Sequence, residues 1–401
     1  MNTASAAERE RLVSSLCNQR RIGFACVLAF AVLLSACGGG GSSPTATAAT
    51  YVAGSKPRAV AIDAAGNAWI ANAGNGTSSI VSGYSNITQL SPTGAVIGTY
   101  LSGSYPYSIA IDASGNVWVA NAGNGVVGTG SVDSNVTELS PNGAWIRTVT
   151  TGAYPEAIAI DGAGNVWVAN QGNGTAGTGA GDSNVTELDS SGSFIGTYVA
   201  GAYPVAIAMD ASNNVWVANQ GNGTAGTGAG DSNVTELDSS GSFIGTYVAG
   251  SYPLKLAIDA SGNVWIPNSG NGNPGTASGD SNITELDSSG NVIGTFITGA
   301  YPEAIAIDGA GNAWVANWGN GTAGTAAGDS DVTVLTPNGA MAGTVEAGSY
   351  PYSIAIDGSG GVWVTNRGDS TAGPATGQSN VSNLMNYGAS GVATPLISQP
   401  R

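Results

Sequence analysis

The chain repeats one pattern of apolar and polar positions. Residues 157–170 read AIAIDGAGNVWVAN: an apolar run, a short turn, and a second apolar run that ends in asparagine. β-Branched and aromatic residues fill both runs, and Asp-x-x-Gly-Asn is typical of tight turns, so the stretch predicts a β-hairpin. Near-copies recur at a spacing of about 49 residues, which indicates a repeat architecture. The copies are centred on Asp63, Asp112, Asp161, Asp210, Asp259, Asp308 and Asp357.

Each repeat predicts four short strands. In the third repeat we expect them at 157–161, 165–170, 184–188 and 194–199, with a long glycine-rich loop between the second and third strands. Four antiparallel strands per unit are the content of a propeller blade, and seven such units can close into a ring. A β-solenoid is the alternative, but it would stack shorter coils of one character. We therefore predict an all-β, seven-bladed β-propeller with four-stranded antiparallel blades over residues 47–401.

Two segments could supply the outer strand of the seventh blade. Residues 47–54 read TAATYVAG and match the fourth strand of the third repeat, which contains GTYVAG at 196–201. The last repeat offers residues 391–398 instead. If the N-terminal segment is used, the first and last repeats share a sheet and the ring is held closed. The sequence leaves both possibilities open.

Charge and composition exclude several classes of function. The chain has 26 acidic and 10 basic residues, a formal net charge of −16, and no histidine. Such an acidic protein is repelled by nucleic acid and by anionic membrane surfaces. The lack of histidine excludes histidine bases, histidine metal ligands, and Ser-His or Cys-His nucleophiles.

The first residues predict export. Arg20 and Arg21 precede an apolar run at 22–34, too short for a permanent membrane-spanning helix, and a Leu-Ser-Ala-Cys sequence ends at Cys37. This ending resembles the lipobox of bacterial lipoproteins, in which the cysteine is acylated; an ordinary signal peptide with a chance cysteine is the alternative. The resemblance implies a signal peptide at 1–36, a Gly/Ser-rich tether at 37–46 and lipidation of Cys37. The protein would then be membrane-anchored, in the periplasm or at the outer membrane or cell surface.

The full repeat also resembles a known group of propellers. The combined pattern YP-x-x-IAIDxxGNxWVAN…SNVTELdxxG over residues 51–390 resembles NHL-type propellers and, more closely, the virginiamycin B lyase (streptogramin lyase) group. That resemblance implies a histidine general base with bound magnesium. Because this chain has no histidine, no catalytic residue of the lyase can be assigned to a position in it.

The invariant and variable positions of the repeat predict different roles. We interpret the repeated aspartates as turn caps and the repeated tryptophans as packing between blades. The residues just after each Tyr-Pro and just after each hairpin asparagine vary between repeats, and both positions should lie at the mouth of the central channel. With the ring of hairpin asparagines they would form a cup for sugars or peptides. The position that follows the residue after Tyr-Pro is mostly alanine or serine but is Lys255 once. The candidate ligand-binding residues are Arg58, Tyr107, Glu156, Lys255, Glu303, Trp318, Tyr352 and Arg367.

These observations favour a binding or scaffold module that recognises a protein or a glycan and performs no chemistry. We expect a monomer without a cofactor, although Glu156 and Glu303 could also flank Ca²⁺ or Mg²⁺. One alternative is a metal-dependent lyase or hydrolase that uses Glu156 or Glu303 as its base. The other is a structural or adhesion protein of the cell envelope.

Overall fold

The computed structural model describes residues 49–384, except 82, 229, 327, 370, 371 and 374–376. The chain divides into two compact units, 1–45 and 46–401, and all described residues belong to the second. Cys37, the tether and the 391–398 segment therefore lie outside the described residues. Within them, no helix is long and apolar enough to cross a membrane.

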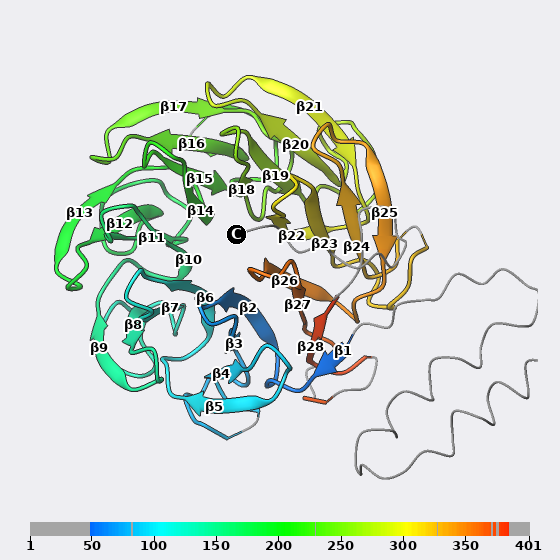
Figure 1. Cartoon of the computed structure of the whole chain (residues 1–401). Helices are drawn as coiled ribbons and strands as arrows, with labels where there is room; N and C mark the ends of the chain where they lie inside the picture. Colours follow the sequence, from blue (N-terminus) through cyan, green and yellow to red (C-terminus); the bar gives the residue numbers. More distant parts are fainter. Residues whose placement is uncertain are drawn as a thin grey trace, which may run out of the picture. The chain divides into compact units, whose positions relative to one another are not determined.

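The second unit is a seven-bladed β-propeller, as predicted. Seven four-stranded antiparallel sheets surround a common centre, and the inner strands β2, β6, β10, β14, β18, β22 and β26 face it (Figure 1).

The strands have nearly the same length in every blade. Blades one and two contain β2 (Pro57–Ile62), β3 (Ala68–Asn72), β4 (Asn86–Leu90), β5 (Val96–Tyr100), β6 (Pro106–Ile111), β7 (Val117–Asn121), β8 (Asn135–Leu139) and β9 (Trp145–Val149). Blades three and four contain β10 (Pro155–Ile160), β11 (Val166–Asn170), β12 (Asn184–Leu188), β13 (Phe194–Tyr198), β14 (Pro204–Met209), β15 (Val215–Asn219), β16 (Asn233–Leu237) and β17 (Phe243–Tyr247). Blades five and six contain β18 (Ala257–Ile258), β19 (Val264–Asn268), β20 (Asn282–Leu286), β21 (Val292–Ile297), β22 (Pro302–Ile307), β23 (Ala313–Asn317), β24 (Asp331–Leu335) and β25 (Met341–Val345). Blade seven contains β26 (Pro351–Ile356), β27 (Val362–Asn366), β28 (Asn380–Asn383) and β1 (Ala49–Tyr51).

The N-terminal segment closes the ring. β1 pairs antiparallel with β28, with Ala49 opposite Asn383 and Tyr51 opposite Val381. The Tyr51 ring also lies 5.7 Å from the Trp363 ring of the same blade. The segment Ala49–Tyr51 is thus the outer strand of blade seven, which resolves the choice that the sequence left open. We call β1 the N-terminal clasp.

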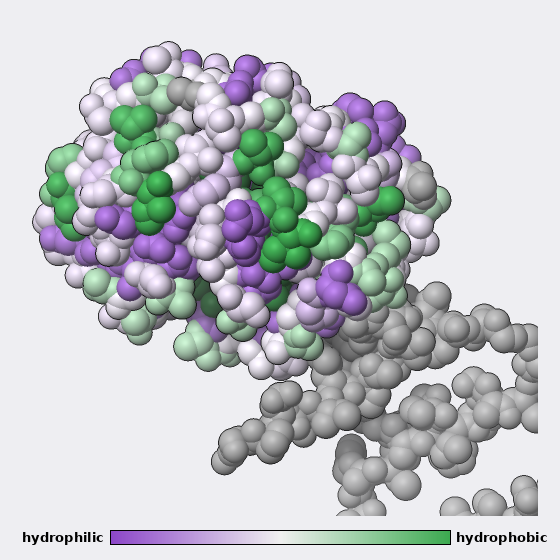
Figure 2. All heavy atoms as spheres, turned by 90° about the horizontal axis from the view of Figure 1, so that it is seen from above, coloured by the Kyte–Doolittle hydropathy of each residue, from purple (hydrophilic) through white to green (hydrophobic). Residues whose placement is uncertain are grey.

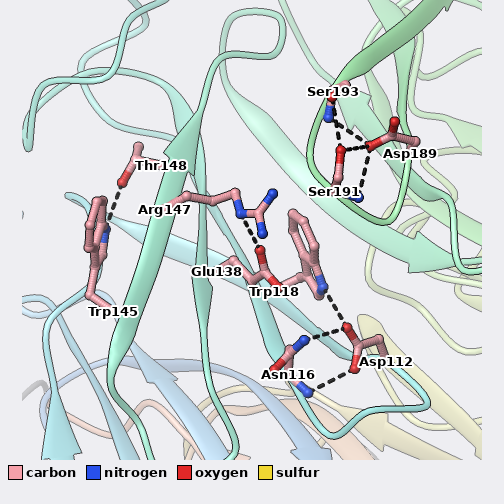
Figure 3. Close-up of polar contacts among 10 residues, drawn as sticks. All are labelled: Asp112, Asn116, Trp118, Glu138, Trp145, Arg147, Thr148, Asp189, Ser191 and Ser193. Carbon is pink, nitrogen blue, oxygen red and sulfur yellow. Dashed lines mark hydrogen bonds and ion pairs between the residues drawn. The ribbon is translucent and has the colours of Figure 1, made fainter.

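The repeated tryptophans and aspartates form the structural frame. Trp167 is fully buried, stacks 5.3 Å from Tyr198 and packs with residues of the next blade, including Ile207. Its indole Nε1 donates a hydrogen bond to Asp161 at 3.1 Å, and Asp161 also accepts from backbone N–H groups of its own turn. Figure 3 shows the equivalent contact between Trp118 and Asp112. The predicted roles in packing and turn capping are confirmed.

The Tyr-Pro dipeptide that recurs at the start of the inner strands joins neighbouring blades. Tyr154 has a positive φ of 52°, and its N–H donates to the Ser134 hydroxyl of the preceding blade at 3.1 Å. Its ring lies against Gly125 of that blade so closely that a Cβ on Gly125 would come within 2.3 Å of it. In blade one, Lys56 replaces the tyrosine. The dipeptide therefore fixes where each inner strand begins.

Candidate functional site at the channel mouth

A cavity of about 500 Å³ lies at the end of the ring where the inner strands begin; we call it the central cavity. Seven of the eight predicted site residues line it: Tyr107, Glu156, Lys255, Glu303, Trp318, Tyr352 and Arg367. The eighth, Arg58, contacts two of the lining tyrosines. The structure thus brings the predicted residues together, and their binding of a ligand stays a prediction.

A β-bulge aims one residue of each inner strand at the central cavity. In blade three, Pro155 pairs with Asn170 and Ala157 pairs with Ala169, so Glu156 between them has no partner across the ladder. The same shift follows the proline in blades one, two, four, six and seven. Bulges re-aim side chains in this way. The variable position after Tyr-Pro is therefore the bulged residue.

Blade five departs from this pattern. Its inner strand β18 has two residues instead of six; before it, an isolated bridge joins Pro253 to Asn268, and the Leu254 N–H donates to the Pro267 carbonyl at 3.1 Å. Pro267 stands in β19 where alanine, or threonine in blade seven, stands in the other blades, and it lacks the N–H that could donate to the inner strand. Pro267 lies inside β19, opposite Ile283, and the adjacent inner strand is interrupted. Lys255 lies in that interruption and lines the central cavity.

Cations and aromatic rings alternate along one side of the cavity. The Arg58 guanidinium lies 3.8 Å from the centre of the Tyr107 ring, and its Nη1 donates to the Tyr352 hydroxyl at 2.7 Å. Arg367 lies 5.1 Å from the Trp318 ring and 5.2 Å from the Tyr352 ring. These distances are within the range of cation–π attraction, which holds both guanidinium groups in place.

The two glutamates sit in an environment that disfavours their charge. Burial raises the pKa of Glu156 and that of Glu303 to about 7, although Lys255 and Arg58 oppose the shift. Burial lowers the pKa of Lys255, against the pull of both glutamates. All three side chains are half-buried and line the cavity. Among the described residues they form no ion pair, whereas Arg147 pairs with Glu138 at 2.7 Å (Figure 3). The cavity therefore gathers three basic and two acidic side chains without a close ion pair among the described residues.

The hairpin asparagines do not belong to this site. We expected them to contribute to the cup, but all seven are fully buried within the blades. Asn170, for example, donates to Asn184 at 2.8 Å and to Thr186 at 2.9 Å in the adjacent strand. The amide of each asparagine links the second and third strands of its blade and so points into the sheet. The expectation that the asparagines belong to the binding cup was wrong.

The cavity also contains residues that were not among the candidates. Gln171, Gln220 and Ser269 follow the hairpin asparagines, and Val205 and Leu254 follow Tyr-Pro. All five occupy the two variable positions, so position in the repeat would have identified them. Tyr301 and Gly319 also line the cavity but occupy positions where the repeats barely vary. Nothing in the sequence pattern distinguished these two residues as lining the cavity.

Comparison with known proteins places the fold. No family model matches the sequence, and no curated protein does. A solved structure of streptogramin B lyase superposes with a TM-score of 0.62 at 13% identity, covering 84% of this chain and 97% of that one. The chain has a virginiamycin B lyase-like fold. Selenomethionine-substituted virginiamycin B lyase from Staphylococcus aureus gives a TM-score of 0.60 at 14% identity, covering 84% of this chain and 98% of that one. A catalytically inactive histidine-to-alanine variant of the S. aureus enzyme, with quinupristin, gives 0.60 at 15% identity with the same coverage.

The likeness to virginiamycin B lyase extends over the ring and, at these identities, is a likeness of fold alone. The missing histidine separates this virginiamycin B lyase-like propeller from an enzyme that is inactive once a histidine is replaced by alanine.

Proposed function

We propose that this propeller is a binding module whose central cavity holds the acidic end of a glycan. The observation that carries the proposal is the placement of positive charge. The described residues contain five basic side chains, Lys56, Arg58, Arg147, Lys255 and Arg367, and three of them meet at the central cavity. In a chain with a net charge of −16, such a concentration of cations favours an anionic ligand.

The remaining lining favours a small polar ligand over a protein surface. Gln171, Gln220 and Ser269 offer amide and hydroxyl groups at the rim, while Val205 and Leu254 offer a limited apolar surface. A cavity of about 500 Å³ is of the size that accepts a small molecule or the end of a chain. A sugar carboxylate could meet the cations while the sugar hydroxyls meet the amides.

A lyase that acts on such an acidic sugar is the second candidate. A glutamate with a pKa of about 7 suits a general base at neutral pH, and two are present. Glu156 or Glu303 would take the proton next to the sugar carboxylate. A carbon–carbon double bond would form as the glycosidic carbon–oxygen bond breaks, and the leaving oxygen would take a proton from water. A divalent metal between the glutamates would face Lys255 and Arg58, and this repulsion argues against the metal-dependent version.

Calorimetry with galacturonate and glucuronate, beside galactose and glucose, tests the proposal. We expect the acids to bind and the neutral sugars to bind at least tenfold more weakly. Arg367→Gln and Lys255→Met should each weaken binding of the acid at least tenfold, whereas Arg147→Gln, which removes a cation outside the cavity, should not. Equal binding of acid and neutral sugar, or no binding of either acid, would overturn the proposal. A tripeptide with a free carboxyl terminus is the probe for the protein-binding alternative.

Incubation with polygalacturonate separates binding from catalysis. The lyase candidate predicts ultraviolet absorbance from an unsaturated product, and this absorbance should be lost in Glu156→Gln or Glu303→Gln. Binding without absorbance favours the binding module. If neither occurs, the structural or adhesion role of the envelope protein is favoured.

The proposal includes the location of the protein in the cell. An acidic glycan of the cell surface is available only to an exported protein, and the leader with Cys37 predicts export and lipid anchoring. Labelling cells with an alkyne-modified fatty acid should tag the full chain and fail to tag Cys37→Ser. Label on the variant, or none on the unmodified chain, would exclude the anchor.

A further inference from the structure

Three equivalent grooves lie between neighbouring blades, away from the central cavity. The groove between blades one and two has a volume of about 320 Å³, the one between blades two and three about 250 Å³, and the one between blades three and four about 330 Å³. Each is formed by the segment after the outer strand of one blade and by the loop and outer two strands of the next. We call them the lateral grooves. Their lining residues correspond at the repeat spacing of about 49 residues.

An exposed aromatic ring stands at the edge of each lateral groove. The rings are Trp145, Phe194 and Phe243, at the start of the outer strand in blades two, three and four, and they are 65%, 65% and 64% exposed. In blades one, five and six the equivalent residue is not aromatic: it is Val96, Val292 and Met341. An aromatic ring at this edge is thus not required by the blade itself. Figure 2 shows that hydrophobic side chains on the visible side of the molecule form separate patches, not one continuous face.

The other lining groups are polar and uncharged. A threonine from the outer strand lies in every lateral groove: Thr148, Thr197 and Thr246. The Trp145 indole donates to the Thr148 hydroxyl at 3.2 Å (Figure 3), which holds that ring beside the groove. The middle groove adds the hydroxyls of Thr150, Thr151 and Thr178. Not one of the lining residues is acidic or basic.

The combination of ring, hydroxyls and missing charge has a specific chemical complement. One face of a pyranose carries C–H groups that pack on an aromatic ring, and its hydroxyls pair with threonine hydroxyls and backbone groups. The absence of charge favours a neutral sugar, in contrast to the central cavity. Repetition at blade spacing suits a polymer, because several weak sites on one body bind a repeating ligand far more tightly than any single site.

We propose that blades two, three and four carry three equivalent sites for a neutral polysaccharide, with Trp145, Phe194 and Phe243 as stacking platforms. The sites are separate from the central cavity. They would bind successive or neighbouring sugar units of one polymer, and each alone would bind weakly.

Affinity electrophoresis through gels that contain dextran, mannan or galactan tests this proposal. We expect at least one of these neutral polymers to retard the full chain. The triple variant Trp145→Ala/Phe194→Ala/Phe243→Ala should lose the retardation at least tenfold in apparent affinity, and each single variant should lose only two- to fourfold. The matched control Val96→Ala/Val292→Ala/Met341→Ala removes exposed side chains at the same strand position in the other blades and should be retarded normally.

Further variants keep the two sites distinguishable. Lys255→Met should keep its affinity for the neutral polymer and lose its affinity for galacturonate. The aromatic triple variant should lose its affinity for the neutral polymer and keep its affinity for galacturonate. Circular dichroism and thermal unfolding confirm that each variant is folded. Because these rings are exposed, their replacement should leave the fold intact. Retardation by none of the three polymers, unchanged retardation of the aromatic triple variant, or an equal loss in the matched control would overturn the proposal.

Discussion

Blade three carries two regions of opposite character on one hairpin. At one end of the inner strand, Trp167 and Asp161 are hydrogen-bonded to each other, buried or half-buried, and the same in all seven repeats. At the other end, Glu156 faces the central cavity, differs between repeats, and has no ion-pair partner among the described residues. The first region satisfies its polar groups and stabilises the ring. The second leaves charge unpaired, which costs stability and serves a ligand instead.

The largest effect expected from this contrast is on the frame. Trp167→Ala removes a fully buried indole that packs between two blades, together with one of the hydrogen bonds that Asp161 accepts. We expect a loss of about 3–5 kcal/mol in the free energy of unfolding, measured by denaturant titration. Glu156→Gln, made in the same hairpin, should cause no loss of stability. If both variants unfolded at the same denaturant concentration, the distinction between the stabilising Trp167–Asp161 region and the cavity would be wrong.

The N-terminal clasp should stabilise the fold, although it lies far from the rest of blade seven in sequence. Tyr51→Ala removes the ring that packs on Trp363 and weakens a strand of three residues. We expect a loss of about 2 kcal/mol by thermal or denaturant unfolding. Phe296→Ala removes the equivalent ring in blade five, which stacks on Trp265 and belongs to a strand continuous with its own blade. A smaller loss for Tyr51→Ala than for Phe296→Ala would show that ring closure does not depend on the clasp.

The two glutamates of the cavity should make the free energy of unfolding depend on pH. Glu156 and Glu303 have pKa values of about 7 in the folded chain against 4.5 for an ordinary glutamate. Between pH 4.5 and 7 the folded state therefore holds more protons than the unfolded state, and the free energy of unfolding falls as pH rises. Because water reaches both groups, we expect a loss of only about 1 kcal/mol across this range.

The double variant Glu156→Gln/Glu303→Gln should flatten this pH dependence. Burial also raises the pKa of Asp331 to about 7, and Asp331 replaces the asparagine found in the other blades. The comparison is therefore best made in an Asp331→Asn background, with denaturant titrations at several pH values. A slope that survives in the triple variant would place the titrating groups outside the cavity.

The sequence predicted the frame in full and the cavity in outline, for different physical reasons. Turn chemistry and blade packing are local demands that every copy must meet, so Asp161 and Trp167 reveal their roles by repetition. The membership of the cavity followed from the variable positions, because the bulge after Tyr-Pro points the same position inward in each blade that has it. The burial of Asn170 was missed since its amide bonds to strand β12, a pairing that depends on register. The pairings of Arg58 with Tyr352 and of Arg367 with Trp318 join different blades, and only the closed ring sets their distances.

The variant with the smallest expected effect on stability tests most directly how Lys255 is placed in the central cavity. Pro267→Ala restores an N–H donor opposite the interrupted inner strand of blade five, so we expect residues 255 and 256 to pair with β19 as in the other blades. Stability should change by less than about 1 kcal/mol, because one gained hydrogen bond is offset by the greater freedom of the unfolded chain. Hydrogen exchange at residues 255 and 256 should slow, and affinity for galacturonate should fall several-fold as Lys255 is drawn back toward the sheet. Slower exchange with unchanged affinity would mean that Lys255 reaches the ligand without the interruption. Unchanged exchange would mean that Lys255 itself, and not Pro267, keeps the strand open.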